Sequence, residues 1–139
     1  MQNLSKNTKP TIFRITGSIS NFFEYYYYYL YLVYLKRKTV APEITAVGTI
    51  AASVGFYGVG ISQLFGYPFP GKESAIVLAI FQMIVTNMIF NDNRRKAIYA
   101  KFSSNNDINF KDNKWKNRAC RYFVFISFIF MLLTALLYR

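Results

Sequence analysis

Four apolar stretches alternate with polar, mostly basic segments along this chain of 139 residues. The clearest stretch covers residues 44–65, where 22 consecutive residues carry no charge. At about 1.5 Å per residue it is long enough to cross the roughly 30 Å hydrocarbon core of a bilayer. Pro42 and Glu43 mark its start, because proline needs no N–H donor in a first helical turn and a carboxylate favours the positive end of the helix dipole. Gly66, followed by two prolines, marks its end. The pattern predicts a membrane-spanning helix over residues 43–65.

Two further stretches are candidates for membrane spans. Residues 74–90 and 122–138 each contain 17 uncharged residues, which is the lower limit for crossing the hydrocarbon core. Tyr122 and Tyr138 flank the last stretch, and tyrosine prefers the two membrane–water boundaries. The loop of residues 66–73 is short enough to make the first two spans an antiparallel hairpin. The pattern therefore predicts an all-α integral membrane protein with three transmembrane helices.

The first apolar segment, residues 18–35, predicts a different kind of helix. It contains five consecutive tyrosines, Tyr25 to Tyr29, and one carboxylate, Glu24. Tyrosine is stabilised at the headgroup boundary, where the ring is buried and the hydroxyl remains hydrated, so five in a row suit the bilayer centre poorly. We therefore expect an aromatic interfacial helix that lies in the membrane surface. A full span by this segment is the alternative.

Positive charge concentrates in one loop. Residues 91–121 contain nine Lys or Arg and three Asp, a net charge of +6. In the loop of residues 66–73, by contrast, Lys72 is balanced by Glu73. The positive-inside rule therefore places the basic loop in the cytoplasm and the short loop and the C-terminus outside. An interfacial first helix keeps the basic N-tail, residues 1–17, in the cytoplasm, whereas a spanning one would place it outside.

The composition of the whole chain agrees with a membrane protein. The formal net charge is +11, and 53% of the residues are hydrophobic while 17% are charged. This leaves too little polar surface for a small soluble core, so residues 1–139 are predicted to form a single membrane domain. A basic balance also raises the hypothesis of nucleic-acid binding. The charges lie beside apolar segments, however, and we therefore expect anionic lipid headgroups as partners and no nucleic acid.

The basic loop is itself predicted to be helical. Residues 94–102 show apolar side chains at helical spacing, residues 103–106 indicate a turn, and residues 111–121 again show helical spacing. We therefore expect a basic helical hairpin in the cytoplasm. Trp115 is expected to pack inside this hairpin or to anchor it at the headgroups, with a partner contact as the alternative. The surface predicted to contact headgroups or a partner comprises Arg94, Arg95, Lys96, Lys101, Lys114, Trp115, Lys116 and Arg118.

Small residues recur on one face of each of the first two spans. Such residues let helix backbones approach closely, which holds helices together in lipid. We expect the two faces to pack on each other, with an oligomer or a partner as the alternative. The Gln82 amide needs a polar partner in hydrocarbon, and we expect Ser53 or Ser62 to supply it; lining a polar pathway is the alternative. The predicted helix-packing residues are Gly48, Ala51, Gly55, Gly58 and Ser62 in the first span and Ala75, Ala79, Gln82 and Thr86 in the second.

Catalytic chemistry is not indicated by the residue types present. The chain contains no His, which is the commonest general base and metal ligand. Its six acidic residues do not have the spacing of a carboxylate metal site, and no phosphate-binding loop or nucleophile-elbow motif is present. Cys120 is the single cysteine, which excludes an internal disulfide. We therefore expect no enzymatic activity, no metal and no cofactor.

Two basic motifs carry a resemblance at the level of pattern. Residues 34–38 read Tyr-Leu-Lys-Arg-Lys at the end of the aromatic segment, and residues 94–102 read Arg-Arg-Lys-Ala-Ile-Tyr-Ala-Lys-Phe. With two spans between these motifs and a Phe-rich span after them, the chain resembles a loose group of uncharacterised small bacterial inner-membrane proteins. The resemblance implies a location in the inner membrane and carries no activity. A phage or organellar origin is the alternative.

These observations favour a non-enzymatic membrane protein that acts through its contacts. One version is an interaction or accessory subunit of a larger membrane complex. Another is an immunity-type protein that binds and blocks a membrane-acting toxin. The alternative is an oligomeric small channel or holin-like pore former, for which the stripe of small residues is the supporting feature.

Overall fold

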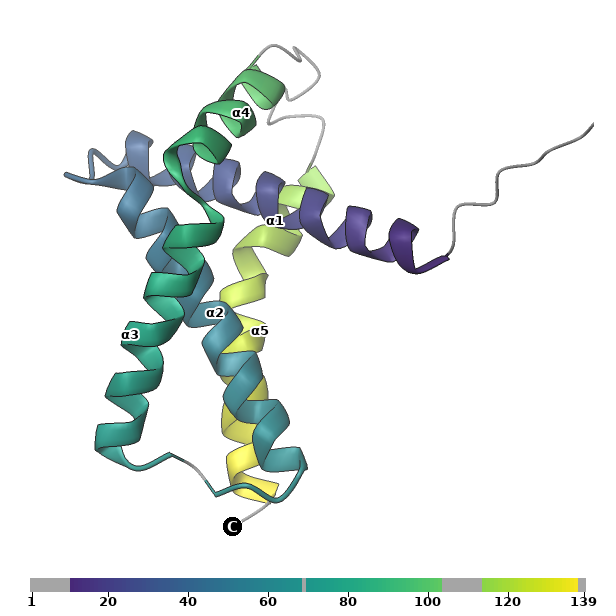
Figure 1. Cartoon of the computed structure of the whole chain (residues 1–139), viewed down its shortest axis with the longest axis vertical. Helices are drawn as coiled ribbons and strands as arrows, with labels where there is room; N and C mark the ends of the chain where they lie inside the picture. The colour runs from purple at the N-terminus through teal and green to yellow at the C-terminus, as the bar shows by residue number, and fades with distance from the viewer. Residues whose placement is uncertain (1–10, 69, 104–113, 138–139) are drawn as a thin grey trace, which may run out of the picture.

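Five helices make up the described part of the chain, which comprises residues 11–68, 70–103 and 114–137 of the computed structural model (Figure 1). Three of them are long and apolar enough to cross a membrane, namely α2, α3 and α5. The all-helical fold class with three candidate spans is therefore confirmed. The predicted N-tail before Thr11 and the flanking Tyr138 lie outside the described residues. The helices are α1 (Thr11–Lys36), α2 (Pro42–Leu64), α3 (Lys72–Ile89), α4 (Asp92–Ser103) and α5 (Lys114–Leu137).

The helix α1 lies across one end of the three candidate spans (Figure 1). Below it, α2 packs along α5 and also on α3, while α1 contacts α2, α4 and α5. A helix that crosses the ends of spans in this way has the orientation predicted for the interfacial segment. The core lies where α1 meets the other helices, and its largest fully buried side chains are Tyr26, Tyr27, Val47, Ile50, Ile98 and Cys120.

The tyrosine run is buried rather than hydrated. Tyr26 and Tyr27 are 0% exposed, because α2, α4 and α5 pack on the face of α1 that carries them. The Tyr26 hydroxyl lies 3.5 Å from Ser53 Oγ, and the Tyr27 hydroxyl lies 3.0 Å from that of Tyr99. The expectation that these hydroxyls remain hydrated is therefore wrong, since side chains of neighbouring helices take the place of water. Burial raises the pKa of Tyr26 to about 12, because the phenolate would lose its hydration.

Two of the helices end in the same backbone motif. At the ends of α1 and α2, an N–H group just beyond the helix donates to a carbonyl of the last turn. In both cases the carbonyl lies five residues earlier in the chain and the hydrogen bond is 3.1 Å long. This motif requires a left-handed residue just beyond the helix. In α2 that residue is Gly66 (φ 82°), and in α1 it is Lys38 (φ 55°). A side chain in this conformation is strained, so α1 ends less favourably than α2.

The chain changes direction between α3 and α4. α3 ends at Ile89, and the side-chain oxygen of Asn91 then accepts the N–H of Arg94 at 2.9 Å. This contact caps the first turn of α4 by satisfying a donor that has no partner within the helix. The last span behaves differently, because α5 runs without a break from Lys114 past the predicted start of the span at Tyr122.

Both predicted arms of the basic hairpin rest on α1. From α4, the ring of Phe102 stacks on that of Tyr28, with centroids 5.4 Å apart. From α5, Asn117 Oδ1 accepts a hydrogen bond of 2.6 Å from the Tyr25 hydroxyl. Residues 104–113, with the predicted turn, lie outside the described residues. The arms are thus held by the aromatic face of α1.

Candidate functional site

The tightest contact between the candidate spans is that of α2 with α5. A Cβ atom added at Gly60 would lie 2.6 Å from Cε1 of Phe130, so only glycine admits the ring there. One turn further, the hydroxyl of Thr134 donates to Oε1 of Gln63 at 2.7 Å, and both side chains are buried. The buried amide that joins two spans is therefore that of Gln63 and not that of Gln82. Gly60 and Gln63 lie three residues apart and so on one helical face, which is the signal that could have revealed them.

The predicted stripe of small residues on α2 is packed only in part. A Cβ at Gly48 would lie 3.6 Å from Cε of Met83 on α3, which is an ordinary packing contact, and Ala51 is buried. Further along the same face, a Cβ at Gly55 or Gly58 would meet nothing within 4 Å. This difference agrees with the divergence of α2 and α3 toward the loop that joins them (Figure 1). The expected packing of the two faces thus holds at one end and leaves small residues open at the other.

The predicted packing face of α3 is only partly covered. Within α3, Thr86 is the one buried residue, and its hydroxyl donates to the carbonyl of Gln82 at 2.7 Å. Ala75 and Gln82 are half-buried and Ala79 is exposed. Val85 is half-buried. The other large apolar side chains of α3 are exposed, namely Ile76, Val77, Leu78, Ile80, Phe81, Met83, Ile84, Met88 and Ile89.

The serines proposed as partners of Gln82 bond elsewhere. Ser53 donates to the carbonyl of Thr49 at 2.8 Å, and Ser62 donates to that of Val59 at 2.7 Å. Each of these bonds stays within α2, as is common for hydroxyl groups in helices. The hydrogen bond expected between Gln82 and these serines is therefore not the one formed.

Two cations of the predicted headgroup surface are bound by a carboxylate of α1. Lys101 Nζ lies 2.7 Å from Glu24 Oε2, and Arg94 lies 3.4 Å from Oε1 of the same residue. Lys101 also donates to Asn21 and Arg94 to Ser20. Glu24, which disfavoured a full span in the sequence, is thus the acid that holds α4 on α1.

Arg95 forms a second ionic contact, between α4 and the ends of two candidate spans. Its guanidinium lies 3.7 Å from Glu43 of α2 and 3.5 Å from Asp92, and it donates to Oδ1 of Asn87 on α3. Glu43 in addition accepts a hydrogen bond from Tyr99 at 3.4 Å. The Arg95 side chain is only 11% exposed. Together with Arg94 and Lys101 it forms part of the fold, whereas the sequence assigned all three to the headgroup or partner surface.

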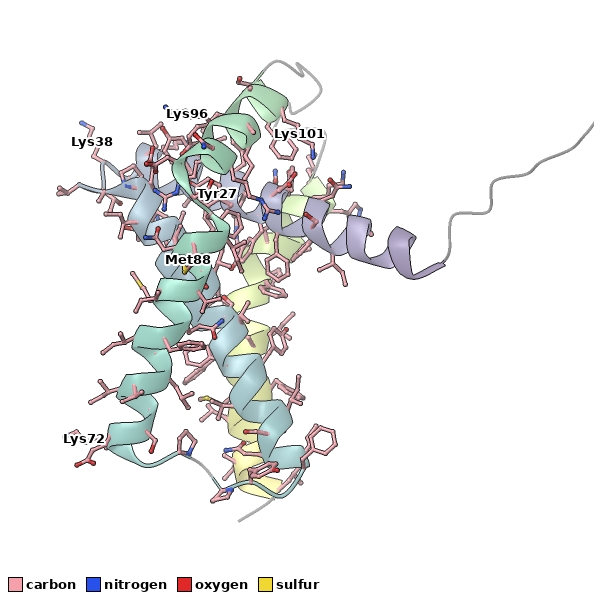
Figure 2. The ribbon with its side chains drawn as sticks, viewed as in Figure 1. Tyr27, Lys38, Lys72, Met88, Lys96 and Lys101 are labelled. Atoms are coloured by element: carbon pink, nitrogen blue, oxygen red, sulfur yellow. The ribbon has the colours of Figure 1, made fainter. Side chains whose placement is uncertain are left out.

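The other residues of the predicted surface remain exposed. Lys96, Lys114, Lys116 and Arg118 are exposed on α4 and on the first turns of α5. Figure 2 shows Lys96 at the end of the molecule where α1 and α4 lie and Lys72 at the opposite end. Trp115 is 81% exposed, with the Arg118 guanidinium 5.6 Å from its ring. The expectation that Trp115 packs inside the hairpin is therefore wrong, while its anchoring at headgroups stays a prediction.

No group of three His, Cys, Asp or Glu side chains that could hold a metal ion occurs in the described ranges. Cys120 is buried in the core beneath α1.

The fold defines a class of protein, since three candidate spans with a helix laid across their ends indicate a multi-pass membrane protein. Comparison with protein-family models gives no match, and neither curated proteins nor solved structures give one.

Proposed function

We propose that the protein is a non-enzymatic accessory subunit of a membrane complex, which binds a helix of its partner between α2 and α3. The observation that carries this proposal is the open end of the small-residue stripe, where Gly55 and Gly58 have nothing within 4 Å of an added Cβ. In lipid, where the hydrophobic effect does not distinguish a partner from an acyl chain, close backbone approach is the main source of helix association. Glycines that the chain itself does not cover are suited to that use.

The exposed face of α3 supports the same proposal. Ala79 is exposed and Ala75 is half-buried on the side of α3 that carries Met83 and Thr86. A partner helix between α2 and α3 would cover these small residues together with Gly55. It would also support a span that has a single buried residue of its own.

The location and orientation belong to the same proposal. Among the described residues, most of the exposed cations lie at the end with α1 and α4, while in the loop at the other end Lys72 is balanced by Glu73. By the positive-inside rule we place α1 and α4 in the cytoplasm and the loop between α2 and α3 outside. The resemblance described above favours a bacterial inner membrane.

The immunity-type version uses the same surface for a different helix, that of a membrane-acting toxin. The two versions differ in when the partner is present, because a subunit has its partner constantly and an immunity protein only when the toxin is made. For the pore hypothesis the described residues offer less support. Thr86 bonds within α3, and Asn87 accepts from Arg95, so two of the polar groups that could line a path are engaged.

Affinity purification tests the proposal directly. The protein is tagged at its N-terminus, extracted in a gentle detergent, and its co-purifying proteins are quantified by mass spectrometry. The double variant Gly55→Leu/Gly58→Leu fills the open stripe and is expected to abolish co-purification while the protein remains monodisperse.

The matched control is Val77→Phe, which adds bulk on the exposed face of α3 away from the stripe. It should retain the partner. A wild-type protein that purifies alone contradicts the subunit function. Equal loss in the control and in the glycine variant contradicts the assigned surface.

A further inference from the structure

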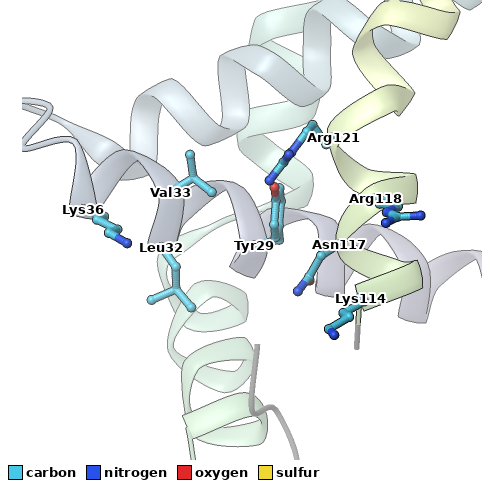
Figure 3. A pocket seen from close by; sticks show the side chains of 8 residues that line it. All are labelled: Tyr29, Leu32, Val33, Lys36, Lys114, Asn117, Arg118 and Arg121. Carbon is cyan, nitrogen blue, oxygen red and sulfur yellow. The ribbon is translucent and has the colours of Figure 1, made fainter. Parts of the chain in front are cut away.

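A basic groove lies between the second half of α1 and the first turns of α5 (Figure 3). Its volume is about 780 Å³. Four cations line it, Lys36 from α1 and Lys114, Arg118 and Arg121 from α5, and two aliphatic side chains of α1, Leu32 and Val33, line it as well. The positions on α5 are three to four residues apart, so one face of that helix presents all three cations to the groove.

The cations of the basic groove differ from those of α4 in their surroundings. Arg94, Arg95 and Lys101 are each within 4.0 Å of a carboxylate, whereas no Asp or Glu is among the described residues that line the groove. The Arg121 guanidinium reaches the hydroxyl of Tyr29 (Figure 3), and Arg118 lies over an indole ring. Both contacts fix a cation without neutralising it.

Like charges held in one groove repel each other, and a bound anion relieves that repulsion. The groove is therefore complementary to an anion. Arginine and lysine together are the usual donors to phosphate oxygens, arginine as a fork and lysine as a point charge.

The position and the apolar lining identify the source of the phosphate. The groove lies at the end of α5 where the candidate span begins, beside the helix that crosses the spans. A free phosphate ion would gain nothing from Leu32 and Val33, whereas the glycerol and first acyl carbons of a lipid would cover them. We propose that the basic groove is a binding site for an anionic phospholipid, with the lipid phosphate held by Lys36, Lys114, Arg118 and Arg121.

This site differs from a general attraction of basic residues to headgroups. It predicts that one lipid stays with the purified protein, and that particular lysines matter while other exposed lysines do not. It also does not depend on the partner surface between α2 and α3, because it lies on α1 and α5.

Native mass spectrometry of the detergent-purified protein tests the proposal, with phosphatidylglycerol and phosphatidylcholine added separately and with inorganic phosphate as a third addition. We expect one phosphatidylglycerol molecule to be retained in preference to phosphatidylcholine. The variant Lys36→Gln/Lys114→Gln should bind phosphatidylglycerol about tenfold or more weakly, since it removes two charge-assisted contacts to the phosphate. Both lysines are exposed, so the fold should tolerate the change.

The matched control is Lys72→Gln/Lys96→Gln, which removes the same charge from exposed positions outside the groove. It should leave retention unchanged, and Lys36→Arg/Lys114→Arg should restore it. Equal weakening in the control and in the groove variant overturns the proposal in favour of diffuse attraction. Equal retention of the two lipids, or retention of inorganic phosphate as strong as that of phosphatidylglycerol, overturns it as well.

Discussion

Replacing Gly60 by alanine should destabilise the protein, although alanine is the better helix former. A Cβ at this position would lie 2.6 and 2.7 Å from two ring carbons of Phe130, whereas carbon atoms in contact are normally about 3.5 to 4.0 Å apart. The ring must therefore move by about 1 Å. It cannot do so freely, because the ring of Tyr57 packs against it with centroids 5.7 Å apart.

The magnitude follows from two opposing effects. Overpacking of a fitted contact costs roughly 1 to 3 kcal/mol, and the change from glycine to alanine within a helix returns up to about 1 kcal/mol. We expect Gly60→Ala to lower the free energy of unfolding by about 1 to 2 kcal/mol. Gly58→Ala is the matched control, because its added Cβ meets nothing within 4 Å, and it should be neutral or stabilising.

The assay is reversible unfolding in mixed micelles of a mild detergent and dodecyl sulfate, followed by circular dichroism. A double-mutant cycle with Phe130→Leu separates the clash from other effects, because the cost of Gly60→Ala should fall when the ring is absent. If Gly60→Ala is as stable as Gly58→Ala, α2 and α5 do not approach each other closely at Gly60.

Three further changes test other parts of the structure by the same unfolding measurement. Glu24→Gln removes the acid shared by two cations of α4 and should cost about 1 kcal/mol, since partly exposed ion pairs contribute little each; a loss that persists unchanged at high salt would contradict an ionic origin. Lys38→Gly should stabilise the protein by up to about 1 kcal/mol, because glycine adopts the left-handed conformation without strain. Gly66→Ala, at the equivalent position of α2, should destabilise the protein. Equal effects of the two substitutions would contradict the shared motif. Thr134→Val leaves the Gln63 amide oxygen without its 2.7 Å donor and should cost roughly 1 to 3 kcal/mol, while no change in stability would mean that water satisfies the amide.

The number and type of the helices could be predicted from the sequence because they depend on local quantities. The length of an apolar run, Pro42 at a helix start and Gly66 at a helix end act within a few residues, and they placed α2 to within one residue at each end. The direction of α1 across the ends of the candidate spans agrees with the prediction, although the tyrosines on which that prediction rested are buried against other helices rather than hydrated.

The contacts between helices could not be predicted from the sequence in the same way. Every glycine of α2 looks alike in sequence, and only the position of Phe130 on α5 shows that Gly60 is the contact while Gly55 and Gly58 are open. The partners of the Gln side chains were not predictable either, because Gln63 bonds to Thr134, which lies 71 positions away in the chain.

Hydropathy by itself determined that this chain has three helices able to cross a membrane, each bounded by polar segments. Charge by itself determined that cations are concentrated between the last two of these spans. The tertiary structure decided which cations have a carboxylate partner among the described residues. Arg94, Arg95 and Lys101 face carboxylates of other helices, while the described lining of the groove with Lys114 and Arg118 contains no Asp or Glu. The physical reason is that hydropathy and net charge are properties of each residue and add along the chain, whereas neutralisation depends on distances of a few ångströms between residues far apart in sequence.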